Sequence, residues 1–160
     1  MDKHSLQQQV LDRLAEDLLR VETAARVAHE TATHEENIAE NKYDTLGLEA
    51  AYLATGQARR AEAIRQAISR WRQFRPGVYD AGKGIQVGAL VTLIDVDDKQ
   101  QRLFIGPDGG SMQVTSDGLL VQVVSSEAPL CRAMLGKAEG DEVSLQIAAT
   151  RQQFEVLSVE

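Results

Sequence analysis

Two stretches of the chain carry apolar residues spaced alternately three and four positions apart, and this spacing restricts the fold more than any other feature. The first stretch lies between residues 11 and 28, and the second between residues 50 and 71. Such a heptad pattern keeps one stripe of a helix facing a partner helix. The stripes are Leu11, Leu14, Leu18, Val21, Ala25 and Ala28, and Ala50, Ala54, Gln57, Ala61, Ile64, Ile68 and Trp71.

The two stripes fit each other in one antiparallel register, in which Leu18 faces Ile64 and Val21 faces Ala61. This register places the reversal of the chain near Asn41. We therefore expect residues 1–75 to form an antiparallel α-helical coiled-coil hairpin, with each helix about 45 Å long at a rise of 1.5 Å per residue. A glycine inside a helix costs about 1 kcal/mol relative to alanine, so we interpret Gly56 as the mark of a close backbone contact.

The second half of the chain changes to a β pattern. Pro76 and Gly77 end the second helix, residues 76–84 form a linker, and residues 85–160 form a small β-rich domain. Five strands are expected, at residues 87–96, 102–105, 119–124, 143–148 and 154–159. Residues 129–135 predict one short helix that begins at Pro129, with Ser126 or Glu127 as its cap. The expected fold class is therefore α+β.

Composition and charge exclude several classes of function. No apolar run reaches the ~20 residues of a membrane span, and the single cysteine, Cys131, forms no internal disulfide. We therefore expect a cytoplasmic protein. A net charge of −7 argues against direct, phosphate-driven binding of nucleic acid. The charge is uneven, since residues 30–49 hold six acidic residues and residues 59–75 hold six arginines.

The β-rich half carries no catalytic motif of its own. It has no His/Cys spacing for a metal and no Ser–His–Asp set, and the loop at residues 106–110 lacks the lysine of a phosphate-binding loop. We expect no stably bound metal and no enzyme activity of the chain's own.

Several C-terminal segments match a known family. The run 123–137 (VVSSEAPLCRAMLGK) leads from a strand through an acidic-Pro turn into a helix, residues 140–143 read GDEV, and residues 154–159 read FEVLSV. In these segments the chain resembles the Gre transcript-cleavage factors of bacteria. The resemblance implies an FKBP-like fold for residues 85–160. It also implies that Ser126, Glu127 and Pro129 bind RNA polymerase at the rim of its secondary channel.

The resemblance gives the predicted end of the hairpin a function. In the family, acidic residues at this end reach the catalytic Mg²⁺ of the polymerase, and the polymerase itself cleaves the transcript. Here Glu40 matches the family's Glu-Asn pair, but Asn37 stands at the position of the family's aspartate. Glu36 and Asp44 lie four residues to either side of Glu40 and are candidates for the second carboxylate.

The resemblance implies a transcription elongation factor that inserts its hairpin into the secondary channel and stimulates transcript cleavage in backtracked complexes. Its partners would be RNA polymerase and, indirectly, the 3′ end of the nascent RNA, and its only cofactor would be the polymerase's Mg²⁺. Two alternatives stay open. One is a channel binder that does not stimulate cleavage, and the other is a coiled-coil dimer or peptide-binding module unrelated to polymerase. We expect a monomer in solution, with a dimer as the alternative.

Overall fold

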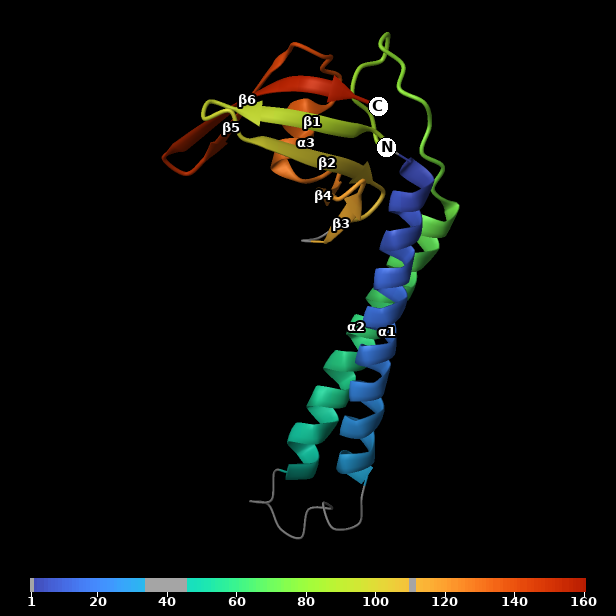
Figure 1. Ribbon diagram of the computed structural model, residues 1–160. Helices are drawn as coiled ribbons and strands as arrows, with labels where there is room; N and C mark the ends of the chain where they lie inside the picture. The colour runs from blue at the N-terminus through green and yellow to red at the C-terminus, as the bar shows by residue number, and fades with distance from the viewer. Residues whose placement is uncertain (1, 34–45, 110–111) are drawn as a thin grey trace. The chain divides into compact units, whose positions relative to one another are not determined.

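The computed structural model describes residues 2–33, 46–109 and 112–160 (Figure 1). The elements are helices α1 (Lys3–Thr33), α2 (Leu46–Gln73) and α3 (Pro129–Met134), and strands β1 (Leu90–Asp95), β2 (Gln100–Gly106), β3 (Gln113–Ser116), β4 (Leu119–Ser125), β5 (Glu142–Ile147) and β6 (Thr150–Val159). The chain forms two compact units. Residues 11–69 make a helical unit, and residues up to Val10 together with those from Arg70 onward make a sheet unit. None of the described helices is long and apolar enough to cross a membrane.

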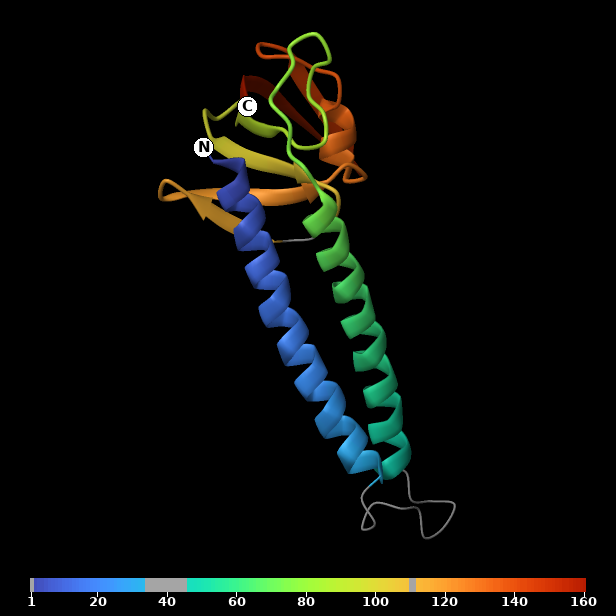
Figure 2. The ribbon, with the colours of Figure 1, turned by 90° about the vertical axis from the view of Figure 1, so that its right-hand side faces the viewer.

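In the helical unit, α1 and α2 run side by side in opposite directions (Figures 1 and 2). Every position of the two predicted stripes is buried or half-buried, and Val21 and Ala61 are among the most buried. The Arg65 guanidinium on α2 donates a hydrogen bond of 2.8 Å to the Glu22 carboxylate on α1. The predicted antiparallel hairpin is therefore confirmed. The predicted reversal near Asn41 lies outside the described residues.

Gly56 does not mark a close contact, and this interpretation was wrong. Among the described residues, a Cβ built at Gly56 would have no heavy atom within 4 Å, apart from its chain neighbours and the backbone of its own helix. Because the site is open and the backbone is helical, we expect Gly56→Ala to raise the free energy of unfolding by about 1 kcal/mol. Chemical denaturation followed by circular dichroism measures this change, and a destabilised variant would contradict the open site.

The sheet unit holds one six-stranded sheet in the order β3-β4-β2-β1-β6-β5. Neighbouring strands are antiparallel except for β2 and β4, which are parallel. The expectation of five strands was wrong because it omitted β3. This strand is short and polar, but the two-residue turn that joins it to β4 is Asp117-Gly118, and both residues have positive φ. An Asp-Gly turn of this kind is a strong hairpin signal, so the sequence did contain the information.

The two faces of the sheet are covered differently. On one face, Cys131 and Met134 of α3 pack in a core with Leu93, Leu103 and Val156. Side chains alternate between faces along a strand, so Phe104 points to the opposite face. There it contacts Trp71 and Phe74, at ring-centroid distances of 6.0 and 6.4 Å. Helix α2 thus ends on the sheet and contributes its last turn to this core.

The first turns of α1 belong to the same core. Leu6 and Val10 are 0% and 1% exposed. The Gln7 amide donates hydrogen bonds to the carbonyl oxygens of Trp71 at 2.6 Å and Phe74 at 2.9 Å. These oxygens are at the end of α2, where a helix leaves carbonyls without partners. The side chain of Gln7 therefore acts as a cap for α2.

Candidate functional site

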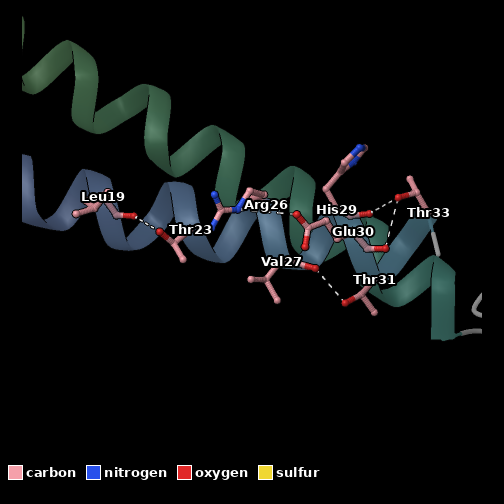
Figure 3. Close-up of polar contacts among 8 residues, drawn as sticks. All are labelled: Leu19, Thr23, Arg26, Val27, His29, Glu30, Thr31 and Thr33. Carbon is pink, nitrogen blue, oxygen red and sulfur yellow. Dashed lines mark hydrogen bonds and ion pairs between the residues drawn. The ribbon is translucent and has the colours of Figure 1, made fainter.

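The predicted acidic residues Glu36, Glu40 and Asp44 lie outside the described residues, and so does Asn37. The structure describes the adjoining end of α1, drawn in Figure 3. The Thr23 hydroxyl donates to the Leu19 carbonyl at 2.8 Å, and the Thr31 hydroxyl donates to the Val27 carbonyl at 3.0 Å. These bonds hold the hydroxyls against the helix backbone, so both side chains turn their methyl groups outward.

The last described turns of α1 carry local side-chain contacts. The Thr33 hydroxyl donates to the His29 carbonyl at 3.0 Å and lies 3.4 Å from that of Glu30, a local side-chain-to-backbone bond of the kind that threonine makes within helices. Arg26 forms an exposed ion pair with Glu30 at 3.9 Å (Figure 3). An ion pair of this exposure contributes little to stability, so its charges are available to a partner surface.

The second predicted site is the turn between β4 and α3. Glu127 and Pro129 are exposed and Ser126 is half-buried. Pro129 stands in the first turn of α3, as predicted, but the N-cap is Ala128 and no side chain caps the helix. The prediction that Ser126 or Glu127 caps it was wrong. The Ala128 N–H instead donates to the Ser125 carbonyl at 3.1 Å in a backbone turn.

A hollow of about 580 Å³ lies beside this turn. It is lined by Leu130, the residue after Pro129, and by residues of the β1–β2 turn and the start of β6. Leu130 and Phe154 give it an apolar part, while Asp95, Lys99 and Arg151 place both signs of charge around it. A largely polar hollow with an apolar part of this kind can hold an apolar side chain of another protein beside polar groups.

Cys131 is fully buried in the core and packs as a small apolar residue. Burial raises the pKa of its thiol to about 11, because the thiolate loses its hydration. Only about one thiol in a thousand is then ionised at pH 8. We expect a thiol reagent to leave Cys131 unmodified in the native protein at pH 8 and to modify it after denaturation, as measured by mass spectrometry. Rapid native modification would contradict its burial.

The six arginines at 59–75 fall into two groups. Arg65 is bonded to Glu22 and Glu62, and these hydrogen bonds raise the pKa of its guanidinium. Arg70 donates to Asp108 in the sheet unit, and Arg75 donates to backbone carbonyls at the end of α2. Among the described residues, Arg59, Arg60 and Arg72 make no ion pair. Part of the basic block is thus structural, which the sequence alone did not reveal.

Among the described residues, no group of three or more His, Cys, Asp or Glu side chains could hold a metal ion.

A known family matches the sheet domain. The family described as "Transcription elongation factor, GreA/GreB, C-term" matches residues 80–160, which is 81 of the 160 residues and so just over half of the chain. The chain belongs to the GreA/GreB family of transcription elongation factors.

Individual relatives agree with this membership. GreA of Xylella fastidiosa is 37% identical over 82 residues, covering 51% of this chain and 48% of the relative. GreA of Xanthomonas axonopodis is 32% identical over 82 residues, with 49% and 47% covered. In these comparisons the chain spans about half the length of the curated relatives it matches. GreA of Alkalilimnicola ehrlichii is 27% identical over 165 residues and is matched over 98% of its length, with 99% of this chain.

Solved structures are also similar to the chain. The GreA factor homolog 1 of Thermus thermophilus is 20% identical, with 94% of each chain covered and a TM-score of 0.37. Gfh1 of Thermus aquaticus is 20% identical, with 98% of this chain and 93% of that chain covered and a TM-score of 0.39.

Proposed function

We propose that this chain is a transcription elongation factor that binds bacterial RNA polymerase and inserts the hairpin of α1 and α2 into the secondary channel. The observation that carries the proposal is the combination of two long antiparallel helices with a domain of the GreA/GreB family. Toward the predicted reversal of the chain, the interhelical positions are alanines such as Ala28 and Ala54. Small residues there keep a hairpin slim.

At the far end of the hairpin, Glu40 together with Glu36 or Asp44 would supply carboxylates to the polymerase's active site. Mg²⁺ prefers hard oxygen ligands and is commonly held by one or two carboxylates with water. Two such ions stabilise the attacking and the leaving oxygen of a phosphodiester hydrolysis. The chain would act as a stimulator of the polymerase's own catalysis, near the 3′ end of the nascent RNA, and would not be an enzyme itself.

The turn before α3 would dock on the polymerase at the rim of the channel. Glu127 and Pro129 are exposed, and since Glu127 does not cap α3, its carboxylate can pair with a basic group of the partner. The hollow beside Leu130 would accept an apolar side chain next to that ion pair. The two contacts complement each other, since the apolar one supplies affinity and the charged one orientation.

A second candidate function is occupancy of the channel without stimulation of cleavage. Asn37 favours it, because this amide stands where the resemblance expects an aspartate. A neutral amide attracts a divalent cation far more weakly than a carboxylate does. In this case the chain would compete with cleavage-stimulating factors for the channel.

Backtracked elongation complexes test the proposal. We expect the protein to accelerate the release of short 3′ RNA fragments, as resolved on a sequencing gel. If no release is accelerated but the protein displaces a GreA protein from the polymerase, the second candidate function is correct. If the protein neither accelerates release nor binds polymerase, both candidates are wrong, and a coiled-coil module with another partner is the correct reading.

A further inference from the structure

We propose that one outward face of α2 docks on an acidic protein surface of RNA polymerase, an inference that rests on the proposed function. This face, the Gly56 patch, consists of Tyr52, Leu53, Gly56, Arg59 and Arg60. On a helix, residues three and four positions before and after a given residue surround it on the surface. All five residues are exposed and belong to the helical unit.

Gly56 is not explained by the packing of the described chain. It lies inside α2, where glycine costs about 1 kcal/mol relative to alanine. Its φ is not positive, so no backbone conformation requires glycine. In the part of the chain that the structure describes, a Cβ there would meet no atom within 4 Å beyond its chain neighbours and the helix's own backbone. What a missing side chain does provide is an open backbone that another molecule can approach closely.

The part of the patch that precedes Gly56 is apolar. Tyr52 is 72% exposed and Leu53 is 57% exposed, on the two positions that lie one turn before the glycine. Tyrosine is among the residues that dominate binding energy at protein interfaces, because it buries a large rigid area at a low cost in conformational entropy. Such a pair beside a bare backbone fits the packing of a partner's helix or loop.

The part that follows Gly56 is basic. Arg59 and Arg60 form no ion pair within the part of the chain that the structure describes, whereas Arg65 and Arg70 on the same helix do. A guanidinium group binds a carboxylate through two parallel hydrogen bonds. The partner surface that fits the patch therefore carries carboxylates opposite Arg59 and Arg60, next to apolar groups opposite Tyr52 and Leu53.

The composition of the patch favours a protein over RNA as its occupant. Binding driven by phosphates needs several cations in one field, but here two arginines stand on a chain of net charge −7, with Glu62 on the same stretch of helix. Leu53 and the helical backbone at Gly56 also provide no free hydrogen-bond donor or positive charge for a phosphate group. A protein surface, in contrast, can contact all five residues of the patch, with apolar groups against Tyr52, Leu53 and Gly56 and carboxylates against Arg59 and Arg60.

The test compares matched pairs of full-length variants in a fluorescence titration with RNA polymerase. Gly56→Leu puts a side chain on the patch at an exposed position where a Cβ meets no described neighbour within 4 Å, and Ala58→Leu adds a side chain at an exposed position on another side of α2. We expect Gly56→Leu to raise the Kd about tenfold or more and Ala58→Leu to leave it within about twofold. Arg59→Glu should weaken binding about tenfold, and Arg72→Glu, an exposed arginine outside the patch, should weaken it much less.

Each outcome supports or overturns the inference. If the unmodified protein does not bind polymerase, the proposed function fails and the patch has no such partner. If it binds and Gly56→Leu binds equally well, the patch alone is refuted. Binding to a single-stranded RNA oligonucleotide that is lost in Arg59→Glu, with polymerase binding intact, would assign the patch to RNA. A dimer in sedimentation that Gly56→Leu dissociates, again with polymerase binding intact, would assign it to a second copy of the chain.

Discussion

Replacing Trp71 with alanine is expected to lower the free energy of unfolding of the sheet unit by about 3–5 kcal/mol. Trp71 is 1% exposed and contacts Phe74 and Phe104 at ring-centroid distances of 5.6 and 6.0 Å. The substitution leaves a cavity between the last turn of α2 and the sheet, and it removes the aromatic contacts. Trp71 is the only tryptophan, so the substitution removes the tryptophan fluorescence signal. Unfolding in urea is therefore followed by circular dichroism.

Two glycines give this prediction matched controls. A Cβ at Gly106 would lie 2.2 Å from the ring of Trp71, so Gly106→Ala should also destabilise the unit, since ring and strand must move apart. Gly56→Ala makes the same chemical change in open space and should stabilise the protein. A loss of less than about 1 kcal/mol for Trp71→Ala, below the range for large buried residues, would show that α2 does not end on the sheet as described.

Replacing Glu40 with alanine is expected to abolish the acceleration of 3′ fragment release in backtracked complexes. Glu40, followed by Asn41, is the carboxylate that the resemblance places at the family's Glu-Asn pair. Without it, the remaining acids would hold a second Mg²⁺ poorly, and the loss of one charged ligand from a metal site commonly costs orders of magnitude in rate. Polymerase binding should be unchanged, because the contacts proposed for Glu127, Pro129 and the Gly56 patch stay in place.

Two further variants decide how the predicted site works. Asn37→Asp restores a carboxylate where the resemblance expects one, so it should increase fragment release above that of the unmodified protein. Glu49→Ala removes an exposed acid in the first turn of α2 and should have little effect. If Glu40→Ala leaves RNA fragment release unchanged, the assignment of Glu40 as a metal-binding carboxylate is wrong. If Glu40→Ala and Glu49→Ala reduce fragment release equally, the effect is a general electrostatic one.

The sequence predicted the helical hairpin because its signal is periodic and long. Apolar residues every three or four positions indicate a helix that packs along one stripe. The burial of the predicted stripes agrees with this interpretation. Short polar strands carry a weaker signal, so β3 was missed although Asp117-Gly118 marked its turn. The role of Gln7 was not predictable, because its hydrogen-bond partners Trp71 and Phe74 stand more than sixty residues away.

The candidate site was predictable only through resemblance. No spacing of residues in the chain indicates a polymerase, and a GreA/GreB match to residues 80–160 is what assigns the family. The structure corrected two local predictions at or near the proposed contacts, since Ser126 and Glu127 do not cap α3 and a Cβ at Gly56 would meet no neighbouring element among the described residues. Both corrections depend on which groups lie near a residue in the folded chain. A pattern along one sequence cannot reveal such groups, because it does not show which neighbours are absent.

The most direct test of the central claim places a short thiol-directed photo-cross-linker at Asn41→Cys, at the predicted reversal of the hairpin. Cys131 is buried and its pKa is raised to about 11, so labelling at neutral pH is confined to the new thiol. With elongation complexes of RNA polymerase, we predict cross-links to the residues around the catalytic Mg²⁺, and their loss when a GreA protein competes. A variant that binds the polymerase but cross-links only to its outer surface would contradict insertion into the secondary channel.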